Sequence, residues 1–207
     1  MLFNVKKCKV MHFEYYNPLV NYEMDGIDLE CVSSEKDLGV VISEDLKWDN
    51  LCKEVDSKAN KMLRMIKRNF TDRTKQTILP LYKSLVRPHL DYCSQIWNPH
   101  YVKDIKLIEG VQSRATKLVE SVKVLHYDER LNILGLMRLD KRRDTSDLIE
   151  TFKILNGNYR VDKDLFFVPD DSGRRGHSRK LFKKRCRLDI KKIAFSNRIV
   201  DNWNSFR

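Results

Sequence analysis

Two adjacent carboxylates, Asp170 and Asp171, come closest in this sequence to a catalytic spacing. Carboxylates that converge on two divalent ions activate an attacking hydroxyl and stabilise a leaving oxygen, as nucleotidyl transfer requires. Pro169 precedes the pair and removes a backbone donor, while Ser172 and Gly173 follow it. The pattern therefore favours an ordinary solvated turn, and no third acid belongs to a motif that would complete a metal site.

The other side chains that could act as nucleophiles or metal ligands are dispersed. The five cysteines and five histidines lack the spacing of a zinc site, and there is no glycine-rich phosphate loop or serine nucleophile elbow. We therefore predict no catalytic and no metal-binding residue in this chain. Scattered thiols, with no signal-peptide segment and no long apolar run, predict an intracellular protein that is not secreted and has no membrane partner.

The positive charge of the chain is concentrated near its C-terminus. Forty Lys and Arg against 29 Asp and Glu give a formal net charge of +11, and residues 174–192 contain ten of these cations but one acid, Asp189. Such groups bind phosphate oxygens and release counterions, so the segment predicts contact with RNA or DNA. Phe182 lies among the charges, where it could stack on a base. The candidate nucleic-acid-binding residues of this segment are Arg174, Arg175, His177, Arg179, Lys180, Lys183, Lys184 and Arg185.

The same segment has two other interpretations. A solubilising, partly disordered tail would have a similar composition. A membrane-surface helix is disfavoured, because the charges precede the amphipathic helix expected at residues 190–206 and do not lie along one of its faces.

Short strands are expected in the first 45 residues. Asp25 and Gly26 form a strong two-residue hairpin signal between apolar runs. The runs expected to form strands are residues 10–13, 22–24, 27–29 and 38–42. A sheet this small requires another element to pack against.

From Trp48 onward the apolar pattern becomes helical. Leu51, Val55, Ala59, Met62 and Ile66 recur at steps of three and four. Further helices are expected from about residue 73 with a kink at Pro80, over residues 108–122, at 127–134 before Gly135, at 138–155 before Gly157, and at 190–206. The predicted fold class is α+β, with a small N-terminal antiparallel β element followed by a mostly α-helical body.

Several stretches, in order along the chain, resemble the region that follows the catalytic aspartates in jockey-like and chicken-repeat-type non-LTR retrotransposon reverse transcriptases. They are residues 4–13 (NVKKCKVMHF), 37–42 (DLGVVI), 81–92 (LYKSLVRPHLDY), 97–99 (WNP), 108–117 (IEGVQSRATK), 127–131 (YDERL), 139–143 (LDKRR), 175–178 (RGHS), 195–198 (FSNR) and 203–204 (WN). The chain departs from the family at Asp91, where glutamate is usual, and at Ser113, where arginine is usual.

The resemblance implies three parts: the end of a polymerase palm at residues 1–46, a helical thumb and post-thumb region at 47–168, and a basic segment with a C-terminal helix at 169–207. It implies that Lys7 lies beside the incoming nucleotide and that Leu38 and Gly39 belong to the primer grip. A solvated lysine and a simple strand bend are the structural alternatives. Weaker candidates for nucleic-acid contact are Arg114, Lys117, Arg142 and Arg143, because a helix normally exposes charge.

The catalytic aspartates of the family precede the matched region. The resemblance therefore implies a truncated RNA-directed DNA polymerase that binds nucleic acid without being an enzyme by itself, and Mg²⁺ is expected only for the full-length enzyme. The expected partners are RNA, DNA and an upstream polymerase portion. Two alternatives remain: a helical protein-interaction adaptor, and a fragment without an independent role, whose unpaired strands would aggregate.

Overall fold

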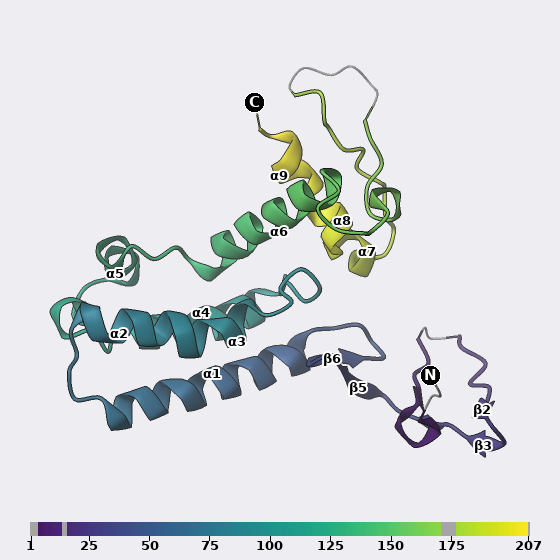
Figure 1. Cartoon of the computed structure of the whole chain (residues 1–207), viewed down its shortest axis with the longest axis horizontal. Coiled ribbons are helices and arrows are strands. Elements are labelled where there is room, and N and C mark those ends of the chain that lie inside the picture. The colour runs from purple at the N-terminus through teal and green to yellow at the C-terminus, as the bar shows by residue number, and fades with distance from the viewer. Residues whose placement is uncertain (1–3, 14–15, 171–176, 207) are drawn as a thin grey trace. The chain divides into compact units, whose positions relative to one another are not determined.

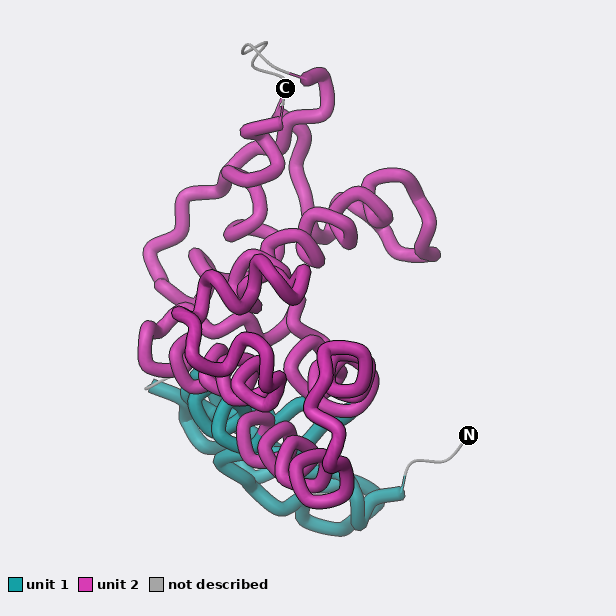
Figure 2. The backbone as a smooth tube through the Cα atoms, turned by 90° about the vertical axis from the view of Figure 1, so that its left-hand side faces the viewer, with its two compact units in different colours: residues 1–54 teal, residues 55–207 magenta. Residues whose placement is uncertain are grey.

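The chain has an α+β fold in a computed structural model, which describes residues 4–13, 16–170 and 177–206. Short strands occupy the N-terminal part and helices form the remainder, as the sequence predicted (Figure 1). Two compact units are distinguished, residues 1–54 and residues 55–207 (Figure 2). The three-part division drawn from the resemblance stays a prediction.

Three two-stranded pairings lie among the described residues of the first unit. β1 (Lys9–Val10) pairs with β4 (Glu30–Cys31) in parallel, whereas β2 (Glu23–Met24) with β3 (Ile27–Asp28), and β5 (Ser34–Asp37) with β6 (Val40–Ser43), are antiparallel. The predicted hairpin is confirmed. Asp25 and Gly26 have φ of 53° and 72°, the left-handed conformation that a two-residue turn of type I′ requires.

Leu38 and Gly39 form the turn of the second hairpin, so the strand predicted over residues 38–42 begins only at Val40. Their φ angles of 45° and 85° suit a two-residue connection between Asp37 and Val40. The strand predicted at residues 10–13 is likewise shorter, because β1 ends at Val10.

α1 (Asp49–Asn69) buries the predicted apolar stripe. Leu51, Val55, Ala59 and Ile66 are buried, and Cys52 and Leu63 join them, while Met62 is only partly buried. A stripe on one side leaves the opposite side of α1 to its charged residues.

A π-helical turn lies between two prolines in the following helical segment. α2 (Lys75–Leu81) continues into η2 (Tyr82–Val86) and α3 (Arg87–Asp91). Pro80 has no backbone N–H, and the N–H of Arg87 donates to the carbonyl of Tyr82, five residues back. α2 continues past Pro80 to Leu81 and the irregular turn begins only at Tyr82, so the kink at Pro80 stays a prediction. The helix begins two residues later than predicted, after its N-cap Thr74.

α4 (Val102–Thr116) is shorter at its end than the predicted helix over residues 108–122. Beyond Thr116 the chain tightens, and the N–H of Glu120 donates to the carbonyl of Arg73 at 3.1 Å. Val122 then returns to the core from the 3₁₀ turn η3 (Glu120–Val122). The long-range bond to Arg73 replaces another turn of helix.

Glycines end the next two helices as predicted. α5 (Tyr127–Leu134) stops at Gly135, which has a φ of 65°. α6 (Leu139–Leu155) is followed by Gly157, with a φ of 70°. Glycine adopts the left-handed conformation easily, and a residue in this conformation commonly ends a helix at its C-terminus.

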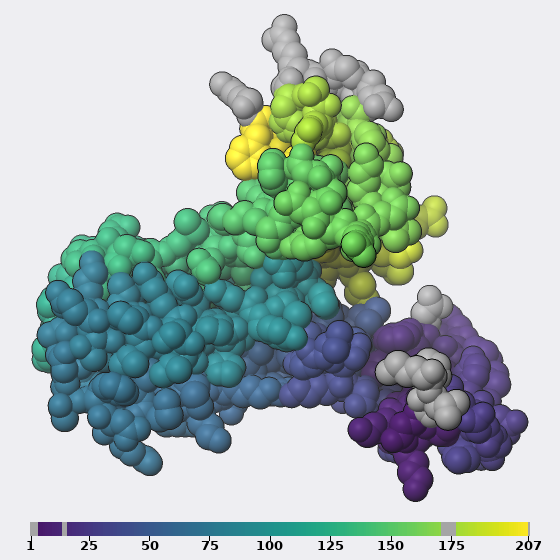
Figure 3. Space-filling model, in the orientation of Figure 1, coloured from purple at the N-terminus to yellow at the C-terminus, as the bar shows by residue number. Residues whose placement is uncertain are grey.

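The C-terminal segment forms three short helices in place of the predicted single helix. α7 (Asp189–Ile193), α8 (Phe195–Arg198) and α9 (Val200–Asn204) follow the 3₁₀ turn η4 (Lys163–Leu165), and Ala194 is extended with a ψ of 146°. A small core forms around Phe167, Leu181, Ile199 and Val200, with Leu148 of α6 packed against it. The last helix, α9 (yellow), lies against α6 (green) in Figure 3.

A buried polar network joins α4 to its neighbours. The Gln112 side-chain oxygen accepts a hydrogen bond from the Tyr82 hydroxyl at 2.7 Å, and its nitrogen donates to the Tyr127 hydroxyl at 3.0 Å. Tyr127 donates in turn to Glu109, whose second oxygen accepts from the Leu139 N–H at 3.0 Å. Burial raises the pKa of both tyrosines, so their hydroxyls stay protonated as donors.

Replacing Tyr127 by phenylalanine is expected to destabilise the chain by about 1–3 kcal/mol, because Glu109 and Gln112 lose a partner in a buried site. Urea unfolding followed by circular dichroism measures the effect. Tyr159→Phe is the matched control. The Tyr159 hydroxyl donates to Glu150 at 2.6 Å on an exposed surface, so its loss is expected to cost much less. Equal losses for the two variants would refute the structural role of the network.

Candidate nucleic-acid interface

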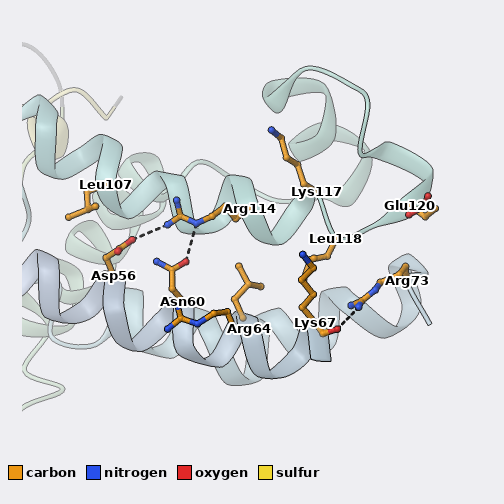
Figure 4. Close-up of a pocket in the computed structure, with 11 residues that line it drawn as sticks. Asp56, Asn60, Arg64, Lys67, Arg73, Leu107, Arg114, Lys117, Leu118 and Glu120 are labelled. Carbon is orange, nitrogen blue, oxygen red and sulfur yellow. Dashed lines mark hydrogen bonds and ion pairs between the residues drawn. The ribbon is translucent and has the colours of Figure 1, made fainter. Parts of the chain in front are cut away.

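A basic groove of about 770 Å³ lies between α1 and α4 (Figure 4). The exposed side of α1 contributes Arg64 and Lys67, which are three residues apart and therefore share a face. Lys117 comes from the end of α4. The residues that line the groove are Asp56, Asn60, Leu63, Arg64, Lys67, Arg73, Leu107, Arg114, Lys117, Leu118 and Glu120.

Arg114 spans the groove from α4 to α1. Its Nη2 donates to Asp56 Oδ1 at 2.9 Å and its Nε donates to Asn60 Oδ1 at 3.0 Å (Figure 4). The sequence favoured a charge held by solvent alone at Arg114, and these two bonds correct that interpretation. The guanidinium connects two helices, and its side chain is still half exposed.

Arg73 is held at the other end of the groove. Its Nη2 donates to the carbonyl of Lys67 at 2.5 Å (Figure 4). Its Nη1 is buried and has no hydrogen-bond partner among the described residues. A buried donor without an acceptor is unfavourable, and a phosphate oxygen would satisfy it.

The groove carries five cations and two carboxylates. Asp56 is engaged by Arg114, whereas Arg64, Lys67 and Lys117 make no ion pair within the described part of the chain. All three of these cations are exposed. The groove thus presents uncompensated positive charge along a concave surface, which attracts polyanions.

The three candidates that the resemblance gave within residues 1–46 lie in the first unit. Lys7 is exposed in the 3₁₀ turn η1 (Val5–Lys7). Leu38 is 83% exposed at the tip of the β5–β6 hairpin, beside Gly39. An exposed apolar tip of this kind fits a contact with another molecule, and the role in a primer grip stays a prediction.

Arg143 is buried, which contradicts its predicted contact with nucleic acid. Its guanidinium lies 4.9 Å from the centroid of the Trp97 ring and donates through Nη2 to the Leu90 carbonyl at 3.0 Å. Such an arginine stabilises the packing of α6. Arg142 is partly exposed, and its Nε donates to Asp91 Oδ2 at 2.8 Å.

His177 is partly buried and hydrogen-bonded within the fold, and its contact with nucleic acid stays a prediction. Its Nδ1 accepts from the N–H of Arg179 at 3.2 Å, and its Nε2 lies 3.0 Å from the carbonyl of Trp203. A carbonyl only accepts, so the hydrogen resides on Nε2. Nε2 therefore holds α9, whereas Nδ1 closes a local turn at Arg179.

The other basic residues of this segment differ in whether the fold engages them. Arg179 donates to Asn156 at 2.8 Å, and Lys183 pairs with Asp201. Lys180 is only partly exposed, and its carbonyl accepts from the Asp170 N–H at 2.9 Å. The exposed basic residues of this segment include Lys184 and Arg185. Arg174, Arg175 and Asp171 lie outside the described residues.

Sequence reasoning missed Arg64, Lys67 and Arg73. The spacing of Lys61, Arg64 and Lys67 places three cations on the side of α1 opposite its apolar stripe, and that signal was present. Nothing local marked Arg73, because its position depends on the carbonyl of Lys67.

Comparison with protein-family models, with curated proteins and with solved structures finds no match for this chain. In the residues that the structure describes, no three His, Cys, Asp or Glu side chains are grouped so that they could hold a metal ion. No helix within the same residues combines the length and the apolar character needed to cross a bilayer.

Proposed function

We propose that this chain is the thumb and post-thumb region of a non-LTR retrotransposon reverse transcriptase, and that the groove between α1 and α4 holds the phosphate backbone of a template–primer duplex. The observation that carries the proposal is the placement of Arg64, Lys67 and Lys117 along one groove, where none of the three pairs with an acid among the described residues. The ordered series of family-like motifs supports it independently.

The chemistry of the groove suits binding to the backbone of a nucleic acid. Ammonium and guanidinium groups neutralise phosphates and release counterions, which gives affinity without sequence preference. A polymerase thumb needs this property, because it must hold every sequence that is copied. Arg73 would add a directed hydrogen bond to one phosphate oxygen.

On this proposal the chain positions the duplex and performs no chemistry. The carboxylates and Mg²⁺ of nucleotidyl transfer belong to an upstream polymerase portion, which is then a partner of this chain together with RNA and DNA. The exposed Lys184 and Arg185 of the basic segment would provide further phosphate contacts.

Binding of a fluorescein-labelled RNA–DNA hybrid at several salt concentrations tests the proposal. The affinity measured by fluorescence anisotropy is expected to fall steeply and linearly on a double-logarithmic plot as salt increases. The absence of hybrid binding in dilute buffer, or an affinity that salt does not alter, would overturn it.

A protein-interaction adaptor is the second candidate, favoured by one observation. An apolar hollow of about 600 Å³ lies between α6 and α9 and includes Leu148, Ile149, Phe152, Trp203 and Phe206. Ile149, Phe152 and Phe206 are each about half exposed. An exposed apolar patch is typical of protein–protein contacts. The adaptor predicts no salt-sensitive affinity for the hybrid, so the same titration separates the two candidates.

A further inference from the structure

A short pairing of extended segments holds Phe182 away from the C-terminal core. The N–H of Phe182 donates to the carbonyl of Val168 at 2.7 Å, beside the bridge between Pro169 and Leu181. Leu181 is buried, whereas Phe182 is 53% exposed. Alternation along the extended backbone thus leaves one large aromatic ring facing outward.

The break between α7 and α8 forms the opposite wall of a small hollow. Ala194 is extended, so the chain bends there. The hollow has a volume of about 160 Å³, and its lining includes Phe166, Phe182, Lys184 and Asn197. Pockets for drug-sized molecules occupy roughly 300–1,000 Å³, so this one fits a single small ring system.

Asn197 supplies a free hydrogen-bond acceptor to the hollow. The residue is 7% exposed and lines the hollow. Its Nδ2 donates to the Lys192 carbonyl at 3.5 Å and to Cys186 Sγ at 3.7 Å, whereas its Oδ1 accepts no hydrogen bond from the described residues. A carboxamide oxygen with this free capacity matches an N–H donor on the edge of a nucleobase.

Two exposed lysines flank the hollow. Lys184 and Lys191 belong to its lining, and neither makes an ion pair with a described residue. An aromatic face, an amide and neighbouring cations together suit a nucleotide, whose base is flat and whose phosphates are charged.

We propose that this hollow takes one unstacked base of a single-stranded nucleic acid, with the ring on Phe182, the base edge at Asn197 and the adjoining phosphates at Lys184 and Lys191. This inference rests on the proposed function, because it assigns a single-strand subsite to a chain that holds a duplex elsewhere. Stacking on phenylalanine is tolerant of sequence, as a polymerase accessory site requires.

The test compares two labelled strands of equal length, an oligouridylate and a strand in which abasic linkers replace every base. Both have the same phosphates, so a difference in affinity reports the rings. The wild-type chain is expected to bind the oligouridylate about tenfold more tightly. Phe182→Ala is expected to abolish that preference, and Phe182→Tyr to retain it.

Phe152→Ala is the matched control, because Phe152 is 54% exposed in the same unit and lies outside this hollow. It is expected to leave the preference unchanged. An unchanged preference in Phe182→Ala, or no preference in the wild-type chain, would overturn the inference. If the hybrid is bound while the two strands are not distinguished, this inference fails alone; if no nucleic acid is bound, the proposed function fails with it.

Discussion

Replacing Asp147 or Arg198 by alanine is expected to lower the free energy of unfolding by about 3–5 kcal/mol, because either change leaves a charge buried without its partner. Arg198 donates from Nε to Asp147 Oδ2 at 2.8 Å and from Nη2 to Oδ1 at 3.1 Å. The two side chains are 15% and 2% exposed, respectively. Such a bidentate pair connects α8 to α6.

Arg198 also connects a third part of the chain. Its Nη2 donates to the carbonyls of Gln95 at 2.9 Å and Ser94 at 3.2 Å, in the turn that follows α3. Burial raises the pKa of the Asp147 carboxyl, and Arg198 acts in the opposite direction by stabilising its charged form. Loss of the arginine would therefore remove the group that makes this charge tolerable.

Urea unfolding of the single variants and of the Asp147→Ala/Arg198→Ala double variant measures the effect. The double variant is expected to lose less stability than the sum of the single losses, since neither charge remains unpaired. Lys192→Ala is the control. It removes an ion pair with Asp189 at 2.7 Å whose side chains are more than half exposed, so a loss below about 1 kcal/mol is expected. Single-variant losses as small as that of the control would contradict this account.

Neutralising the groove is expected to reduce affinity for an RNA–DNA hybrid on the order of 100-fold near 0.1 M salt, as three lost phosphate contacts imply. The variant is the triple change Arg64→Gln, Lys67→Gln and Lys117→Gln. All three side chains are exposed, so the fold is expected to survive. Fluorescence anisotropy of the labelled hybrid measures the affinity.

The matched control removes the same charge elsewhere on the second unit. Lys103, Lys106 and Lys163 are exposed and lie outside the groove, and all three become glutamine. A small loss is expected, because net charge alone acts through screened, longer-range attraction. Equal losses in the two triple variants would show that overall charge governs binding and that the groove has no special role.

The parts of the fold that sequence predicted are those determined by local chemistry. Asp25-Gly26 specifies its hairpin through backbone conformation, and Gly135 specifies the end of α5 in the same way. Local chemistry does not specify the end of α4. That end depends on the hydrogen bond from the Glu120 N–H to the Arg73 carbonyl, and these two residues are distant in sequence. The break at Ala194 has no comparable marker in composition.

The positive charge of the chain was predicted to lie at residues 174–192 and not in the groove between α1 and α4. Composition indicated a partner rich in phosphate, but it could not distinguish a cation in solvent from one inside the fold. Arg143 packs against Trp97, and His177 is hydrogen-bonded to the Trp203 carbonyl. Both contacts exist only after folding. The apolar stripe of α1 implied its charged opposite face, and only the packing of α4 turned that face into a groove.

The decisive measurement is the salt dependence of binding to one RNA–DNA hybrid by the wild-type chain, the groove variant and the control variant. Each phosphate contact contributes about −0.9 to the slope of log affinity against log salt. The slope for the groove variant is expected to be smaller in magnitude by about 2.7, because three such contacts are lost. The control variant is expected to keep the wild-type slope. Equal slopes for the wild-type chain and the groove variant would contradict the binding of phosphates in the groove.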